Sequence, residues 1–130
     1  MLDMSEIILP WPAPSLWPNS RVDRRKSSAT RKAYRADGAK AVWAAGFRKL
    51  NWDQAHLRIT FHPPCRRVRD LDNMLAAIKS ALDGVSDAIG IDDSRWELSL
   101  RRGPVVDGGA VHVALIPPVA DTKFYGNSGA

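Results

Sequence analysis

The sequence contains a single cysteine, no long hydrophobic run and no basic, apolar start. Cys65 cannot form an internal disulfide, and alone it cannot anchor a structural zinc ion. The longest apolar stretches are only a few residues long, which excludes a membrane-spanning helix. Residues 1–6 carry acids where an export signal carries lysines. These absences predict a cytoplasmic protein with no membrane partner.

The composition, with 45% hydrophobic and 25% charged residues, predicts one globular domain. We place this domain at residues 1–118 and expect a flexible C-terminal tail at 119–130. The net charge of +5 is unevenly distributed. Residues 1–69 hold fourteen Lys or Arg and five Asp or Glu, whereas residues 70–130 hold five and nine. This asymmetry suggests a polyanionic partner and a carboxylate-rich site, with a merely solvated basic surface as the alternative.

Hydrophobic patterning predicts four strands and two helices. The strands are expected at 7–9, 56–62, 96–101 and 110–116, and the helices at 29–50 and from 71 to about 83, with an extension to 88 left open. The order β-α-β-α-β-β predicts an α+β fold, with two helices packed on a mixed sheet of about four strands.

Four prolines fall within residues 10–18, between the first strand and the first helix. This segment is expected to be extended and non-helical. Its two tryptophans, Trp11 and Trp17, have little local core to enter. They either anchor an interface with another molecule or pin the segment onto its own sheet.

Three arginines, Arg66, Arg67 and Arg69, closely precede an Asp-x-Asp pair. If a helix begins at residue 71, Asp70 lies near its N-cap and Asp72 lies in its first turn, where the two carboxylates can converge. Carboxylates in these positions either cap the helix or bind a metal ion.

The same helix carries a cation on the side of Asp72. At about 100° per residue, Lys79 and Asp83 lie in a narrow stripe with Asp72. The apolar residues form the other, core-facing side, namely Met74, Leu75, Ile78, Ala81, Leu82 and Val85. Lys79 is therefore either an ordinary surface lysine or a cation that serves the carboxylates.

A second acidic pair, Asp92 and Asp93, precedes the third predicted strand. Adjacent acids in a turn are usually solvated, but together with Asp70 and Asp72 they provide hard oxygen ligands suited to Mg²⁺. The sequence lacks an EF-hand pattern, zinc-ligand spacing, a phosphate-binding glycine loop and a recognisable nucleophile motif. The three histidines are expected to be ordinary strand residues, without partners at useful spacing; they are His56, His62 and His112.

The two acidic motifs resemble those of the RusA family of Holliday junction resolvases, endodeoxyribonucleases often carried by phages. The resemblance lies in residues 69–73, followed by a helix and then residues 90–94. Residues 9–12, 18–22 and 32–35 are similar to the N-terminal pattern of the family, so that the resemblance spans roughly residues 7–116.

The resemblance implies that Asp70, Asp72 and Asp93 bind Mg²⁺, for which Mn²⁺ can substitute. It also implies a catalytic lysine on the helix. The family places this lysine one turn after the second aspartate, where this sequence has Ala76, and Lys79 is the candidate one turn further on. The implied protein is a homodimer that binds branched DNA and cuts two strands of a four-way junction.

The expected reaction is metal-assisted hydrolysis of a DNA phosphodiester. Basic side chains would hold the DNA backbone, and the candidates are Arg21, Arg24, Arg25, Lys26, Arg66, Arg67 and Arg69. One alternative is a non-catalytic nucleic-acid-binding module, which leaves the aspartates unexplained. The other is an inactive phage homologue, with which Ala76 is compatible.

Overall fold

The computed structural model describes residues 6–21 and 24–118, and within this part the side chains of Arg24 and Lys26 are not described. The predicted tail at 119–130 therefore lies outside the described residues. The same holds for the DNA-binding roles expected of those two side chains.

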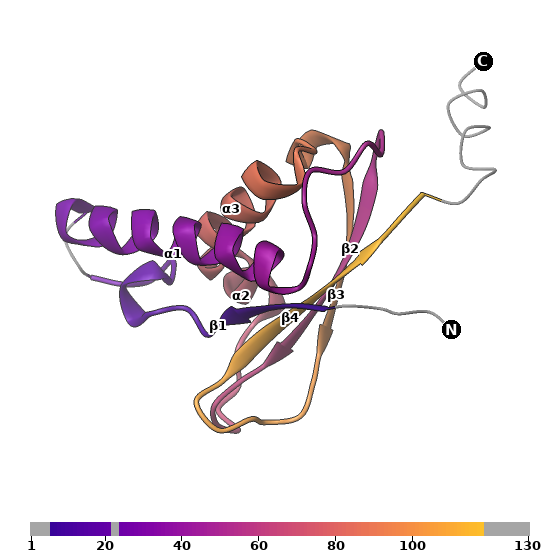
Figure 1. Cartoon of the computed structure of the whole chain (residues 1–130). Coiled ribbons are helices and arrows are strands. Elements are labelled where there is room, and N and C mark those ends of the chain that lie inside the picture. The colour runs from indigo at the N-terminus through magenta and orange to yellow at the C-terminus, as the bar shows by residue number, and fades with distance from the viewer. Residues whose placement is uncertain (1–5, 22–23, 119–130) are drawn as a thin grey trace, which may run out of the picture.

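Four strands and three α-helices form an α+β fold, in which the helices lie on one side of a single sheet (Figure 1). The elements are β1 (Glu6–Pro10), α1 (Arg24–Ala44), β2 (Ala55–His62), α2 (Leu71–Ala77), α3 (Lys79–Ile89), β3 (Trp96–Arg102) and β4 (Ala110–Ile116), with short 3-10 turns η1 (Pro14–Leu16) and η2 (Asp93–Arg95). The strand order is β1-β4-β2-β3, with β2 and β3 parallel and the other pairs antiparallel. The prediction of a mixed four-stranded α+β fold is confirmed. None of the helices in the described ranges has the length and apolarity needed to cross a membrane.

The core lies between the sheet and the α1–α3 pair. Strand β2 alternates buried and half-buried residues, and its inward side chains Leu57, Ile59 and Phe61 are fully buried. Two helical glycines permit close packing of α1 on α3. A Cβ on Gly38 would collide with the backbone of α3, and one on Gly84 would collide with the backbone of α1. These glycines therefore serve the helix crossing, although each weakens its own helix.

Helix α1 begins five residues before the predicted start and ends six residues before the predicted end. It stops because Gly46 adopts a positive φ of 91°, and its N–H bonds to the carbonyl of Trp43. This is the usual way in which a glycine terminates a helix.

The second predicted helix is two helices. Ile78, with φ −97° and ψ 6°, breaks the helix and separates α2 from α3. Its N–H contacts the carbonyls of both Met74 and Leu75, at 3.3 and 3.2 Å. Helix α3 then continues to Ile89, so the extension left open by the sequence is present.

The proline-rich segment contains the 3-10 turn η1, so the prediction of a wholly non-helical segment is wrong at residues 14–16. Pro14 opens this turn. The fixed φ of proline suits a 3-10 turn as well as an extended chain, and proline needs no N–H partner at the first position.

Candidate functional site

Helix α2 presents the Asp-x-Asp motif on an exposed end. Asp70 is the N-cap residue in an extended conformation, but its side chain forms no capping hydrogen bond. Asp72 lies in the first turn, where its Oδ1 accepts the N–H of Asn73 at 3.0 Å. Capping therefore does not account for the Asp70 carboxylate, and both carboxylates are exposed to solvent.

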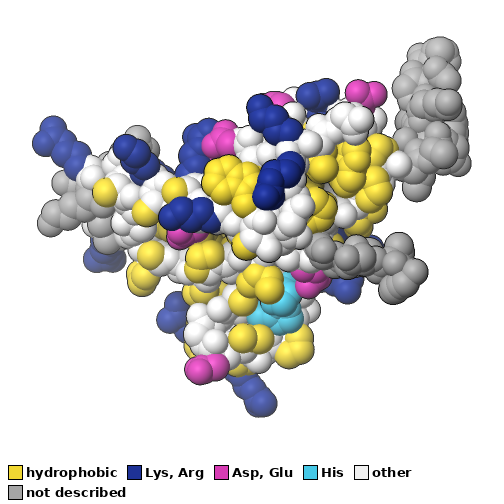
Figure 2. Space-filling model, viewed as in Figure 1, with side chains coloured by type: hydrophobic (Ala, Val, Ile, Leu, Met, Phe, Trp, Pro, Cys, Tyr) yellow, Lys and Arg dark blue, Asp and Glu magenta, His cyan; other side chains and the backbone are white. Residues whose placement is uncertain are grey.

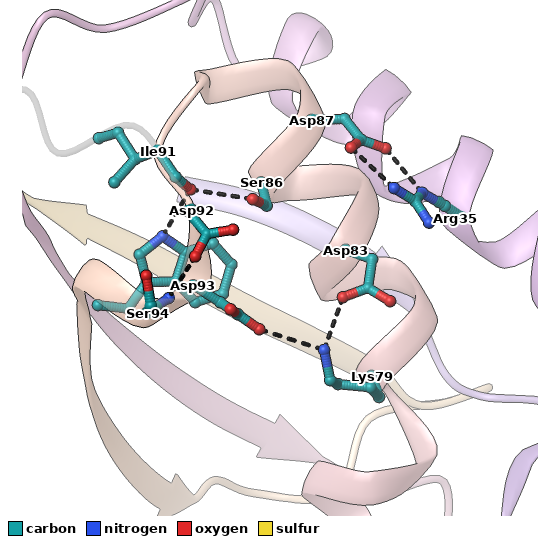
Figure 3. Close-up of polar contacts among 10 residues, drawn as sticks. Arg35, Lys79, Asp83, Ser86, Asp87, Ile91, Asp92, Asp93 and Ser94 are labelled. Atoms are coloured by element: carbon teal, nitrogen blue, oxygen red, sulfur yellow. Dashed lines mark hydrogen bonds and ion pairs between the residues drawn. The ribbon is translucent and has the colours of Figure 1, made fainter.

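Lys79, the first residue of α3, is held between two carboxylates. Its Nζ donates to Asp83 Oδ1 at 2.7 Å and to Asp93 Oδ2 at 3.2 Å (Figure 3). The hydrogen bond to Asp83 is the largest cause of a raised pKa for Lys79, and Asp93 adds to it. The ammonium therefore stays charged at neutral pH, next to the turn that carries Asp93.

The two adjacent acids after α3 have different surroundings. Asp92 caps the turn η2, because its Oδ2 accepts the N–H of Ser94 at 3.0 Å. Hydrogen bonding to Ser94 also lowers the pKa of Asp92. Asp93 instead directs its carboxylate to Lys79 (Figure 3). Of the pair, Asp93 is the one that contacts Lys79.

The turn that carries Asp93 is fixed from behind by two hydrogen bonds to one carbonyl. Ser86 Oγ and Trp96 Nε1 donate to the carbonyl oxygen of Ile91, at 2.9 and 3.1 Å. Because Ser86 is in α3 and Trp96 is in β3, these bonds set the position of the loop between them.

The predicted metal ligands are not gathered into one cluster. Among the described residues, no three Asp, Glu, His or Cys side chains are grouped so that they could hold a metal ion. Asp72 and Lys79 are seven residues apart, which is ~10 Å of helical rise, and Asp93 is bound to Lys79. Asp70 and Asp72 nevertheless suit Mg²⁺, which needs only one or two carboxylates when phosphates and waters supply its other ligands.

A cleft of about 410 Å³ lies beside Asp70. The proline-rich segment forms one wall and the segment that leads into α2 forms the other. The lining residues are Trp11, Pro12, Pro14, Trp17, Asn19, Arg67, Val68, Arg69, Asp70 and Asn73. The two tryptophans are half-buried, so they pin the segment, as one sequence alternative proposed, and also line a cavity.

Arg69 organises the segment before α2. Its Nη1 donates to the carbonyls of Cys65 and Arg67, at 3.1 and 2.9 Å, and its Nη2 contacts Cys65 Sγ at 3.2 Å. Its guanidinium carbon lies 5.5 Å from the ring centroid of Trp11. Hydrogen bonding to the Arg67 backbone and to the Arg69 side chain lowers the pKa of the Cys65 thiol. Arg69 therefore shapes the wall of the cleft, while Arg66 and Arg67 are exposed.

Helix α1 provides further cations. Figure 2 shows Lys and Arg side chains distributed along this part of the molecule. Arg21, just before α1, and Arg25, within it, are exposed as expected, and so are Arg31 and Lys32. Arg31 and Lys32 are not among the predicted DNA-binding residues, although the seven-residue spacing of Arg25 and Lys32 already places these two on one side of a helix.

The histidines lie on strands, as expected, but they do have partners. His56 Nε2 is 2.6 Å from Ser99 Oγ, and His112 Nδ1 is 2.9 Å from Glu6 Oε1. The rings of His62 and His112 pack edge to face at 4.7 Å. The prediction that they lack partners at useful spacing is wrong, because the partners come from neighbouring strands and loops that the sequence does not place together.

Comparison with known proteins leaves the family open. No family model matches the sequence. The chain is similar to an uncharacterised protein of Xylella fastidiosa (strain Temecula1), with 40% identity over 96 residues. The matched region covers 72% of this chain and 63% of that relative, so the chain spans less than two thirds of the relative's length.

Proposed function

We propose that the chain is a Mg²⁺-dependent endodeoxyribonuclease of the RusA type, which resolves four-way DNA junctions by paired nicks. The contact between Lys79 and Asp93 is the observation that supports this most strongly. It joins the second acidic motif to the helical stretch that begins with Asp70 and Asp72. The turn after α3 thereby lies against the stretch that carries Asp70 and Asp72 at its start, with a cation at the contact.

Asp70 and Asp72 are the residues that would hold Mg²⁺, together with oxygens of the DNA phosphate. A Mg²⁺ ion held there would supply Lewis-acid chemistry, through polarisation of a phosphoryl oxygen and activation of a water molecule. The Lys79 ammonium is suited to stabilise the negative charge that develops on the phosphate. Asp93 holds the Nζ of Lys79 in position.

The exposed cations are suited to hold the sugar-phosphate backbone. Arg66 and Arg67 lie next to the Asp-x-Asp motif, while Arg21, Arg25 and Lys32 lie at and within α1. Contacts of this kind release counterions, so that binding should weaken steeply as salt is raised.

One chain provides one such site, whereas junction resolution needs two cuts. We therefore propose that the active species is a homodimer, since two-fold symmetry relates two sites in the way that two opposed strands require. Sedimentation equilibrium at micromolar concentration should give the mass of a dimer. A monomer that makes single, uncoupled nicks would contradict the paired mechanism.

A non-catalytic DNA-binding protein is the second candidate. It is favoured by the lack, among the described residues, of three grouped metal-ligating side chains, and by the exposed Ala76, where the resembled family has its lysine. It leaves the uncapped Asp70 carboxylate without a role, because an acid at a phosphate-binding surface repels DNA unless a cation intervenes.

Junction cleavage with and without divalent metal separates the two candidates. We expect a labelled four-way junction to be cut in Mg²⁺ or Mn²⁺ and to remain intact in excess chelator. Fluorescence anisotropy should show that junction binding persists in the chelator, since arginines and lysines provide most of the affinity. Cleavage in chelator would refute the metal mechanism, and binding without cleavage in either metal would favour the second candidate.

A further inference from the structure

The tryptophan walls of the cleft beside Asp70 are held in place by the protein itself. Trp17 Nε1 donates to the carbonyl of Pro12 at 3.5 Å, and the rings of Trp11 and Trp17 lie 5.9 Å apart with a 44° tilt. The Arg69 guanidinium lies over the ring of Trp11. Both indoles therefore have fixed orientations without a ligand.

The segment that carries these indoles is also anchored at its start. Tyr34 Oη, from α1, donates to the carbonyl of Pro10 at 2.6 Å. On the side of the sheet, Trp11 packs directly against Gly109, where a Cβ would come within 2.8 Å of the indole ring. These contacts oppose collapse of the cleft, so its aromatic wall is preorganised.

Three other lining residues match the parts of a nucleotide. Asn19 and Asn73 provide amides, each of which can donate to and accept from the edge of a base. Arg67 provides an exposed guanidinium suited to a phosphate. Indole surfaces suit a base of any sequence, because every base has a π-face. The volume of about 410 Å³ lies in the ordinary range of small-ligand sites.

We propose that this cleft binds one unpaired nucleotide of the DNA substrate, with its base against Trp17 and its phosphate toward Arg67. The inference rests on the proposed function, since it takes the ligand to be DNA, and it adds a base-binding subsite beside Asp70. Fully paired duplex cannot present a free base, whereas strands that separate at a branch point can. The subsite therefore favours branched over linear duplex DNA.

The test compares a short oligodeoxythymidine strand with the same strand made of abasic nucleotides, in chelator so that nothing is cut. Wild-type protein should bind the base-bearing strand about tenfold more tightly, which is typical of base stacking on an aromatic side chain. Trp17→Ala should lose most of this difference, because the stacking surface is gone, and Trp17→Phe should keep a larger part of it. The matched control is Trp43→Ala, at an exposed tryptophan outside the cleft, which should keep all of it.

Arg67→Ala should weaken binding of both strands to the same degree, since its partner is the phosphate. Equal binding of the two strands by wild-type protein would overturn the proposal, as would full discrimination by folded Trp17→Ala. A second readout does not depend on any variant. A 2-aminopurine base in the strand should lose fluorescence when it stacks in the wild-type cleft, and unchanged fluorescence at saturating protein would also overturn the proposal.

These outcomes are separable from failure of the proposed nuclease activity. If wild-type protein cuts no junction but discriminates the two strands through Trp17, the nuclease proposal fails and the subsite stands. If junctions are cut in Mg²⁺ but the base contributes nothing to binding, the subsite alone fails.

Discussion

The N-terminal ends of α2 and α3 differ in how their charges are satisfied. At the start of α2, the Asp70 side chain makes no capping hydrogen bond and borders an open cleft. At the start of α3, Lys79 is held between Asp83 and Asp93, and the turn behind Asp93 is fixed through the Ile91 carbonyl. The first end is available to a ligand from solution, whereas the second is already organised by the chain.

Under the proposed function, this difference suggests that the two ends have different roles in catalysis. The end with the exposed carboxylates would take the metal and the phosphate. The organised end would supply a positioned cation, with little reorganisation when the substrate binds. Substitutions at the first end should therefore abolish cleavage. Substitutions at the second end should reduce the cleavage rate without abolishing it.

The largest effect is expected at the open end. Asp70→Asn or Asp72→Asn keeps the size of the side chain but removes its charge. Cleavage of a four-way junction in Mg²⁺ should fall at least about 100-fold, because the metal loses a carboxylate ligand. Junction affinity in chelator should hold or rise, since a charge that repels phosphate has been removed. Asp53→Asn, an exposed acid in the loop before β2, is the matched control and should cut normally.

The adjacent acids Asp92 and Asp93 should respond differently to the same change. Asp93→Asn weakens the hold on Lys79 and should lower the cleavage rate by about tenfold or more. Asp92→Asn should have little effect on the rate, because asparagine is as good a helix-capping residue as aspartate. Loss of cleavage in Asp92→Asn with normal cleavage in Asp93→Asn would reverse the assignment of the two residues.

A lysine at residue 76 should compensate for loss of the one at residue 79. Ala76 is exposed and lies one turn after Asp72, so a lysine there would reach the open end. We expect Lys79→Ala to lower the cleavage rate and the double variant Lys79→Ala, Ala76→Lys to regain part of it in a single-turnover assay. The single variant Ala76→Lys should cut at least as fast as the wild type. If the folded double variant cuts no faster than Lys79→Ala, Lys79 does not replace the lysine of the resembled family.

The smallest expected effect concerns stability rather than cleavage. Arg35 of α1 pairs with Asp87 of α3 at 2.7 and 2.9 Å, and this hydrogen bonding lowers the pKa of Asp87 below its ordinary value of 3.8. A lowered carboxyl pKa contributes stability above the ordinary value, and the contribution is lost as the pH falls through the folded-state pKa. Asp87→Asn should lower the Tm by a few degrees at most at pH 7, since the pair is exposed. The difference should vanish in acid, and an equal difference at pH 7 and pH 2 would exclude the ion pair as its cause.

Much of the fold could be predicted from local patterning. The alternation in β2 and the apolar side of α2 and α3 correspond to residues that are buried, as for Ile59 and Val85. The break at Ile78 could not be predicted, because residues 75–80 contain neither proline nor glycine. Ile78 is itself fully buried, as the apolar pattern of the helix predicts.

Less of the candidate site could be predicted. The acidic motifs and Lys79 are visible as residue types at particular spacings, but the contact between Lys79 and Asp93 depends on how the turn after α3 folds back. The cleft joins residues 11–19 to residues 67–73, and no local rule pairs these segments. The sequence therefore predicts only that Trp11 and Trp17 anchor an interface or pack on the sheet. Their position beside Asp70 is visible only in the tertiary structure.

The most direct test of the proposed function maps the nicks on a four-way junction whose four strands are labelled in turn. Incubation with wild-type protein in Mg²⁺ and separation on a denaturing gel should show nicks at symmetric positions in two opposed strands. The same reaction with Asp70→Asn, at equal junction binding, should show none. Junctions that stay intact with wild-type protein at saturating binding, or nicks that persist in Asp70→Asn, would contradict the account.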